Sequence, residues 1–364
     1  MRAIVMTATG GPEVLVATEV PAPRAGAGQI LVRTEAIPVL WPELMLRSGQ
    51  FPTAIAPPLV FGFQAAGTVV EVGAGADPAL LGARVVAQTD GTGSYAEYVA
   101  ARAEAATPIP DGLDTDTAAA LLMPGSVATV LLDTAALTGS ETVLVQAGAT
   151  GIGAHLVRHA KAGGAARVIA TAGGAAKLAR AADLGADTVI DHNEPDWPER
   201  LRSALDGTTL DVVFDAIGGE SARTLLDLMT PLRGRMLVYG LLSGAPAQIS
   251  AADVLARGLT LVGCSGPHWS ARVGAAGPRV LAEAVAGPRD HVHTVLPLGE
   301  AAAAHRLVES RSPLGSVLLR PETPHRGPMI GGSRTGSGSA EPSAVRVLRV
   351  PTYRPHPLGE GGRP

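Results

Sequence analysis

A glycine-rich turn that directly follows an apolar run is the segment of this sequence best suited to chemistry. Val143-Leu144-Val145 leads through Gln146-Ala147 into the turn. A buried strand that ends in such a turn and opens a helix presents backbone N–H groups and the positive end of the helix dipole to an anion. We therefore expect a dinucleotide pyrophosphate to be bound here, by Gly148, Ala149, Thr150, Gly151, Ile152 and Gly153.

The glycines of this turn have separate roles in that interpretation. Gly148 would allow the tight turn, and Gly153 would let the helix pack closely on the strand. Thr150 stands where the usual Gly-x-Gly-x-x-Gly pattern has its middle glycine, although Gly151 follows it. The motif is weaker for this reason, and the elements around it must support the assignment.

The end of the next expected strand indicates which dinucleotide is bound. Sites for NAD carry an acidic residue there, which binds the ribose hydroxyls. This strand instead ends Thr171-Ala172-Gly173-Gly174, and Lys177 lies just beyond it. A missing carboxylate and a nearby ammonium both favour the additional phosphate of NADPH. The alternative, that Lys177 is only a solvated helix residue, stays open.

Strands and helices alternate regularly around the turn. Such alternation predicts an α/β fold with a doubly wound parallel sheet of the Rossmann type. The expected strands are Glu141–Gln146, Arg167–Thr171, Thr188–Asp191, Leu210–Asp215, Arg235–Tyr239 and Thr260–Cys264. The expected helices cover 115–137, the stretch from the turn to Lys161, Ala175–Leu184, Trp197–Leu205 and Glu220–Met229.

The first 110 residues follow a different pattern, which is β-rich. Short apolar runs separated by turn signals predict a partly open barrel. They are Ile4–Met6, Ile30–Val32, Gly67–Val72, Arg84–Ala87 and Tyr95–Val99. After residue 267 we expect a helix, the strand His291–Leu296, the helix Glu300–Glu309 and the strand Gly315–Leu319, which return to this barrel.

Composition limits the function further. A chain of 364 residues with 46% hydrophobic and 17% charged residues suits about two folded domains. The net charge of −4 without a basic stripe argues against nucleic acid as a partner. We find no signal peptide and no continuous apolar run of membrane-spanning length, and the single cysteine suits a cytoplasmic protein. Glycine, proline, serine and arginine dominate from residue 322, which predicts a disordered tail over 322–364.

Taken together, these segments resemble the medium-chain dehydrogenase/reductase superfamily, in particular its zinc-independent quinone oxidoreductase branch. Gly10-Gly11-Pro12-Glu13, Leu46-Arg47-Ser48-Gly49, Gly93-Ser94-Tyr95-Ala96-Glu97 and Phe214-Asp215-Ala216-Ile217-Gly218-Gly219 carry the resemblance together with the glycine turn. The resemblance covers roughly residues 1–321 and implies a Rossmann domain inserted into a GroES-like domain.

The family fold implies how the chain is divided. Residues 1–121 and 267–321 would form the GroES-like catalytic domain, and residues 122–266 the cofactor domain. The nicotinamide would lie in the cleft between them, and a homodimer is expected. Further residues expected to contact the cofactor, beside Thr171, Gly173 and Lys177, are His192, Ile217, Gly218, Tyr239 and Gly240.

The sequence departs from its zinc-dependent relatives at the metal ligands. Those relatives use a cysteine and a Gly-His-Glu segment for the catalytic metal and four further cysteines for a structural one. This chain has Gly62-Phe63-Gln64 in place of that segment, and its only cysteine is Cys264. Zinc requires a tight cluster of Cys, His or carboxylate ligands, so we expect no metal site.

It also departs from its own branch around the substrate. Leu40 stands where relatives carry asparagine, Phe51 where a tyrosine is frequent, and Gln64 where they carry glutamate. Ser126 begins the segment that corresponds to a Leu-Thr-Ala run. With Trp41, these residues are our candidates for lining an unusually apolar substrate pocket. Ordinary core packing is the alternative for Trp41 and Phe51, and no proton donor is identified.

Hydride transfer to a small conjugated carbonyl compound is the reaction that these residues favour. The cofactor supplies the hydride, and a quinone product can take its protons from water. An enone gains more from an enzyme-bound donor at the developing enolate oxygen. We therefore expect NADPH-dependent quinone reduction first. Enone or enoyl-thioester reduction, or nucleotide binding with little turnover, are the alternatives.

Overall fold

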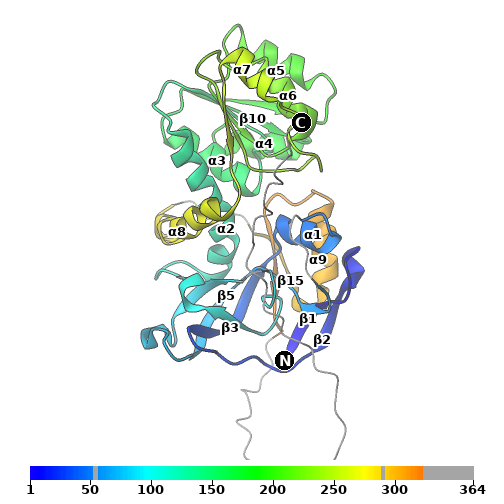
Figure 1. Ribbon diagram of the computed structural model, residues 1–364, viewed down its shortest axis with the longest axis vertical. Helices are drawn as coiled ribbons and strands as arrows, with labels where there is room; N and C mark the ends of the chain where they lie inside the picture. The colour runs from blue at the N-terminus through cyan, green and yellow to red at the C-terminus, as the bar shows by residue number, and fades with distance from the viewer. Residues whose placement is uncertain (52–55, 90, 288–291, 323–364) are drawn as a thin grey trace, which may run out of the picture.

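The computed structural model describes residues 1–51, 56–89, 91–287 and 292–322. They form two halves, one built on a parallel sheet and one on mainly antiparallel sheets, with α2 and α8 between them (Figure 1). The expected tail lies outside the described residues, apart from Glu322.

The first half contains a six-stranded sheet in the order β11-β10-β9-β12-β13-β14. Every pair of neighbouring strands in it is parallel. This is the strand order of the Rossmann fold, so the expected doubly wound sheet is confirmed. The strands are β9 (Thr142–Val145), β10 (Arg167–Ala172), β11 (Thr188–Asp191), β12 (Val212–Asp215), β13 (Arg235–Val238) and β14 (Thr260–Gly263).

Helices cover both faces of this sheet because its central strands are apolar on both sides. Val143 and Val145 of β9 pack in one hydrophobic core with Leu156 of helix α3. Leu144 packs in a second hydrophobic core with Leu201 of helix α5. Successive strand residues thus supply opposite cores. The helices are α3 (Gly151–Ala162), α4 (Ala175–Asp183), α5 (Trp197–Leu205), α6 (Gly219–Leu226) and α7 (Ala251–Arg257).

The second half is the expected partly open barrel. A three-stranded antiparallel sheet, β2-β1-β4, accompanies a larger sheet in the order β15-β16-β3-β5-β6-β8, with β7 on β3. Two short helices, α1 (Trp41–Ser48) and α9 (Ala301–Glu309), pack against it. The strands are β1 (Arg2–Met6), β2 (Leu15–Glu19), β3 (Gln29–Pro38), β4 (Leu59–Val60), β5 (Gln64–Val72), β6 (Arg84–Gln88), β7 (Tyr98–Arg102), β8 (Ala106–Pro108), β15 (Val292–Pro297) and β16 (Ser316–Arg320).

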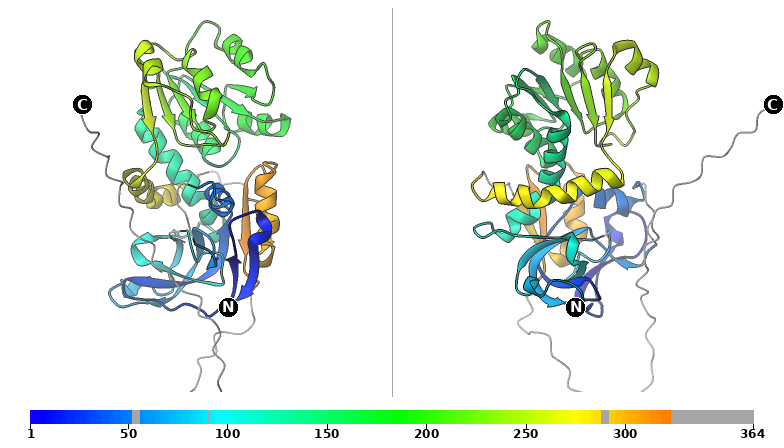
Figure 2. Two further views of the ribbon diagram at one scale, coloured as in Figure 1. Left: turned by 45° about the vertical axis from the view of Figure 1, so that its right-hand side comes forward. Right: turned by 60° about the vertical axis from the view of Figure 1, so that its left-hand side comes forward.

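Two long helices join the halves. α2 (Thr115–Ala135) begins at Asp114, whose carboxylate accepts the Thr117 N–H at 2.8 Å. α8 (Pro267–Ala284) lies alongside α2 between the two sheets (Figure 2). The expected domain boundaries fall inside α2, after residue 121, and at the start of α8.

The length and composition of α2 would allow it to cross a membrane, although it contains no continuous apolar run of that length. However, 67% of its most apolar window is buried inside the protein. Its apolar residues contact β3, β5, α3 and α8, which is the environment of a core helix.

Local expectations differ from the structure at β7, at α1 and at α7 (Ala251–Arg257), a short helix that was not expected from the sequence. The strand expected from Tyr95 begins only at Tyr98, because the Tyr95 backbone bonds outside the large sheet, to Ile4 and Phe61. The Tyr95 ring is fully buried there. The helix α1 was not expected from the sequence, although Pro42 and Glu43 in its first turn and Gly49 after its last residue are typical helix boundaries.

Candidate active site

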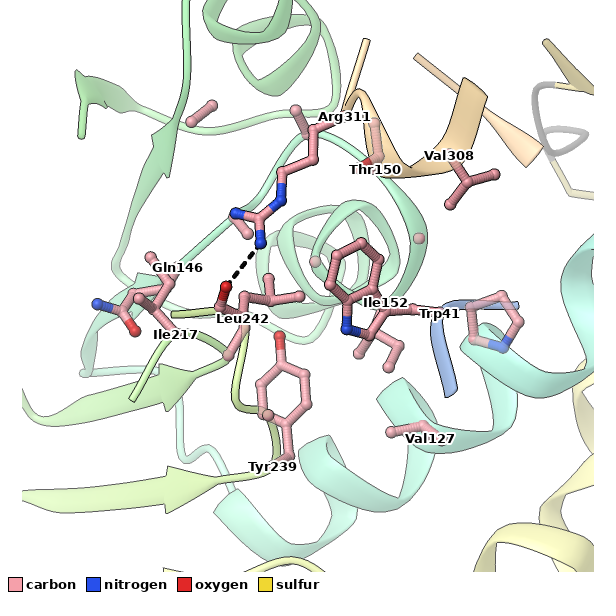
Figure 3. A pocket seen from close by; sticks show the side chains of 18 of the residues that line it. Trp41, Val127, Gln146, Thr150, Ile152, Ile217, Tyr239, Leu242, Val308 and Arg311 are labelled. Carbon is pink, nitrogen blue, oxygen red and sulfur yellow. Dashed lines mark hydrogen bonds between the residues drawn. The ribbon is translucent and has the colours of Figure 1, made fainter. Parts of the chain in front are cut away.

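A cavity of about 650 Å³ lies at the carboxyl edge of the parallel sheet and extends to the antiparallel half. It is lined by residues that follow β9 and β12, the neighbouring strands at which the strand order reverses. Ligands of doubly wound sheets bind in the crevice at this position. Figure 3 shows that side chains from both halves point into the space.

The glycine turn forms one wall, and its geometry excludes side chains at two positions. A Cβ on Gly153 would lie 2.1 Å from the carbonyl oxygen of Ala147, and one on Gly148 would lie 2.8 Å from the Cβ of Ala170. Thr150 is the N-cap of α3, yet its side chain caps no N–H of the first turn. The amides at the start of α3 therefore remain for an anion, as a pyrophosphate requires.

Three basic side chains gather at one end of the cavity: Lys177, His192 and Arg311. The Lys177 ammonium donates to the Arg311 carbonyl, and His192 Nδ1 lies 3.1 Å from Thr171 Oγ1. Burial, with the charge of Arg311 second, lowers the pKa of Lys177. Burial also lowers the pKa of His192, while neighbouring Asp191 opposes the shift. This end suits a phosphate group.

The other end of the cavity is apolar. Its walls come from the segment before α1 and from α2, so the two halves of the protein meet there. The residues are Pro38, Val39, Leu40, Trp41, Ala120, Met123 and Val127. A flat apolar acceptor fits such a lining better than a charged one.

Two polar side chains of the cavity wall have a fully buried atom without a hydrogen-bond partner among the described residues. These atoms are Gln146 Oε1 and the Tyr239 hydroxyl. Burial, with Asp215 second, raises the pKa of Tyr239 well above its usual value, so the hydroxyl stays protonated at neutral pH. Both atoms remain for a bound ligand.

Most of the expected site residues line this one cavity. Among the cofactor candidates these are Ala149, Thr150, Gly151, Ile152, Gly153, Thr171, Gly173, Lys177, His192, Ile217, Tyr239 and Gly240, and among the substrate candidates Leu40 and Trp41. Gly148 lies beneath the turn, and Gly218 donates its N–H to Asp215 at 2.8 Å.

Three substrate candidates are not among the lining residues. Phe51 packs against Phe63 with a ring separation of 6.1 Å. Gln64 is buried and its amide donates to the Ala119 carbonyl at 2.9 Å, so its hydrogen-bonding capacity is directed into the core. Ser126 is buried in α2, and its hydroxyl has no partner among the described residues.

Sequence reasoning missed Arg311, Trp197 and Trp269, which also line the cavity. All three tryptophans of the chain therefore face the same space. Arg311 follows α9 in the antiparallel half, and no local pattern could place it beside Lys177. The helical spacing around Trp197 and Trp269 favours core packing equally well.

Metal ligands do not cluster in the part of the chain that the structure describes. No group of three or more His, Cys, Asp or Glu side chains there could hold a metal ion. Cys264 lines the cavity, and burial raises the pKa of its thiol to about 11, which disfavours the thiolate form that zinc binds.

Comparison with known proteins extends over both halves. Residues 26–111 match the alcohol dehydrogenase GroES-like domain, and residues 151–280 match the zinc-binding dehydrogenase family. The second description names a metal, but the ligand set described above does not provide for one. The GroES-like expectation for the antiparallel half is confirmed.

Full-length relatives and solved structures agree with these matches. A 2-haloacrylate reductase from Burkholderia sp. is 33% identical over 88% of this chain and 99% of its own length. Quinone oxidoreductase 1 from Escherichia coli is 30% identical over 86% of the chain and 97% of its own length. The structure of the Escherichia coli quinone oxidoreductase complexed with NADPH superimposes with a TM-score of 0.80, at 30% identity, over 88% of this chain and all of that one. The chain therefore belongs to the medium-chain dehydrogenase/reductase superfamily, in its quinone oxidoreductase branch.

Proposed function

We propose that this protein uses NADPH to reduce a quinone or a similar conjugated carbonyl compound, without zinc. The observation that carries the proposal is one cavity with the Lys177 ammonium and the neutral His192 at one end and apolar Leu40 and Trp41 at the other, with the Arg311 side chain reaching from one end toward the other. A phosphorylated cofactor and a flat apolar acceptor would occupy opposite ends of this space.

The residues present fit the cofactor. The uncapped start of α3, closed beneath by Gly153, would hold the pyrophosphate, and Lys177 with Arg311 would hold the phosphate on the adenosine ribose. No carboxylate follows β10, which ends at Ala172 and leads into Gly173. When bound, the cofactor supplies the hydride.

The protein contributes positioning and exclusion of water at the acceptor end. Leu40, Trp41 and Val127 offer no charged group to the acceptor, so the acceptor would be held by shape and apolar contact. A quinone suits this wall because its reduced oxygens can be protonated by water. The Tyr239 hydroxyl is a buried, protonated donor in the cavity wall that has no partner among the described residues.

A second candidate function is reduction of an activated carbon–carbon double bond. The 33% identity to a 2-haloacrylate reductase favours it, although this reaction gains more from an enzyme-bound proton donor than quinone reduction does. A nucleotide-binding protein with little turnover is the third reading.

The test is NADPH oxidation by purified protein against quinones, enones, enoyl thioesters and 2-haloacrylates, with NADPH binding measured alongside. We expect quinones to give the highest kcat/KM and alcohols to give no reaction with NADP⁺. Tight NADPH binding with no turnover across all acceptors would overturn the proposed reaction and favour the binding protein.

We also propose that the protein is located in the cytoplasm, which suits an enzyme that consumes NADPH. We further propose that it is a homodimer. β14 is an edge strand of the parallel sheet, and Leu261 on this strand is 41% exposed; Leu255 on the preceding helix α7 is 84% exposed. An uncovered edge with apolar side chains is typical of a surface that pairs with another chain. Light scattering should give twice the chain mass, and Leu261→Lys should lower it.

A further inference from the structure

Arg311 makes three contacts that join both ends of the cavity. Its carbonyl accepts the Lys177 ammonium, and its guanidinium donates to the Leu242 carbonyl at 2.6 Å. The same guanidinium lies over the Trp41 ring, 5.1 Å from the ring centroid. Figure 3 shows the Arg311 side chain reaching across the cavity between Leu242 and Trp41.

We propose that Arg311 is a positioning residue that couples the phosphate-binding end of the cavity to Trp41, the aromatic wall of the acceptor site. This proposal rests on the proposed function, since it assumes a phosphorylated cofactor at Lys177. It makes Trp41 a specificity-determining residue whose orientation depends on what Arg311 contacts.

The backbone at Trp41 is fixed, so its side chain is the part that can respond. Leu40, the N-cap of α1, donates its N–H to Glu43 at 2.8 Å, and Glu43 is fully buried. Trp41 itself is half-buried and borders the cavity. A guanidinium stacked on the indole restricts rotation of the ring and thereby sets the shape of the acceptor wall.

The electrostatics show how a phosphate would act on this contact. After burial, the charge of Arg311 also lowers the pKa values of Lys177 and His192, so the Arg311 guanidinium is close enough to interact with both groups. A phosphate placed among them would compete with the Leu242 carbonyl for the Arg311 guanidinium. Lys177 contacts the backbone carbonyl of Arg311 and not its side chain, so a change in the contacts of the guanidinium does not require the loss of this bond.

The first test uses Trp41 as the reporter. In a Trp197→Phe/Trp269→Phe protein, Trp41 is the remaining tryptophan. Titration with 2′,5′-ADP should change its emission saturably, and 5′-ADP should not. Adding Arg311→Gln should abolish this change while calorimetry still detects 2′,5′-ADP bound through Lys177. Arg306→Gln, an exposed arginine on α9 outside the cavity lining, should leave the response intact.

The outcomes separate the two proposals. An unchanged Trp41 response in Arg311→Gln, or no response although calorimetry shows 2′,5′-ADP bound, overturns the coupling and leaves the proposed function standing. Failure of both 2′,5′-ADP and NADPH to bind the starting protein overturns the proposed function itself, and the coupling with it.

A kinetic cycle in the protein with all three tryptophans provides a second readout. Arg311→Lys keeps the charge but loses the planar stack, so the KM for a bulky aromatic quinone should rise roughly three- to tenfold. The KM for NADPH should change less than about twofold. Trp41→Leu should remove the effect of Arg311→Lys on the quinone KM, because coupled residues are not additive. Additive effects would contradict the proposal.

Discussion

The hydroxyl oxygen of Tyr95 lies 2.6 Å from a carboxylate oxygen of Glu43, and both side chains are completely buried. Glu43 also accepts the backbone N–H groups of Leu40 and Phe63, so it joins the start of α1 to the segment before β5. His305 Nε2 lies 3.1 Å from the same hydroxyl. With Tyr95 donating to Glu43, neutral His305 donates from Nε2, which agrees with an unpartnered Nδ1.

The pKa values of Glu43 and His305 predict how the stability of the folded protein depends on pH. Burial raises the pKa of Glu43 from its usual 4.5 to about 7, against the hydrogen bonds that lower it. The folded protein therefore keeps a proton that the unfolded chain loses. This contribution to stability is complete below pH 4.5 and is lost as pH rises through 7. Burial lowers the pKa of His305 to about 3, which gives the opposite trend between pH 3 and 6.5.

Replacing Glu43 by glutamine should remove the contribution of Glu43 to the pH dependence of stability and leave that of His305. Between pH 4.5 and 7 the stability of Glu43→Gln relative to the unsubstituted protein should rise by up to about 1.4 kcal/mol per pH unit. Urea denaturation at pH 5, 6 and 7 measures it. Glu13→Gln, at an exposed carboxylate, should run parallel to the unsubstituted protein. A parallel curve for Glu43→Gln as well would show that Glu43 is ionised throughout.

Lys177 should discriminate between the two nicotinamide cofactors. A charge-assisted contact to a phosphate contributes roughly 1.5–3 kcal/mol, so Lys177→Ala should weaken NADPH binding about ten- to a hundredfold. NADH binding should change little. Fluorescence titration with each cofactor measures both constants, and equal losses for the two cofactors would remove Lys177 from this role.

Leu40→Asn should return an amide to the position that relatives use. Leu40 borders the apolar end of the cavity, so an amide there can donate to the oxygen of an enolate. We expect kcat/KM to rise about tenfold for an enone and less than about threefold for a quinone. Leu40→Ala enlarges the cavity without adding a donor and should not reproduce this difference. An equal effect of both substitutions would contradict the donor explanation.

Zinc should be neither bound nor required. The described residues lack a group of three ligands, although one matching family is described as zinc-binding. Elemental analysis of purified protein should find far less than one zinc per chain, and dialysis against a chelator should leave NADPH oxidation unchanged. A stoichiometric metal would show that the ligand assignment is wrong.

The chain after Pro321 should be dispensable for folding and cofactor binding. Its composition offers little apolar surface to offset the ordering of the chain. Among the described residues, truncation after Pro321 removes the exposed ion pair of Arg2 with Glu322, at a cost of at most about 1 kcal/mol. The melting temperature should fall by less than about 4 °C. Loss of NADPH affinity would show that the segment contributes to the site.

The parallel half could be predicted from the sequence because its signals are local. Strands buried on both faces give short continuous apolar runs such as Val143–Val145, and the turn that follows must contain glycine where Gly153 meets Ala147. Helix α1 has equally local signals at Pro42 and Gly49, but it is only eight residues long and shows no extended helical periodicity.

The acceptor side could not be predicted in the same way because it depends on contacts between distant segments. Arg311 is 134 residues from Lys177 along the chain, and only the assembled fold brings them together. Gln64 was selected by its position in relatives, yet its amide bonds to Ala119 inside the core. Correspondence of position therefore identified the segment but not the direction in which the side chain points.

The continuous helix α2 has a consequence for how a bound ligand contacts the cavity wall. The chain crosses between the halves through α2 and again just before α8, where Gly266 has φ of 89°. Pro124 inside α2 has no N–H, so the Ala120 carbonyl lacks its helical partner at the point where both residues border the cavity. The interruption of the α2 hydrogen-bond ladder at Pro124 therefore lies in the wall of the cavity itself, so a ligand bound there would contact the helix at the turn where it is least constrained by its own hydrogen bonds.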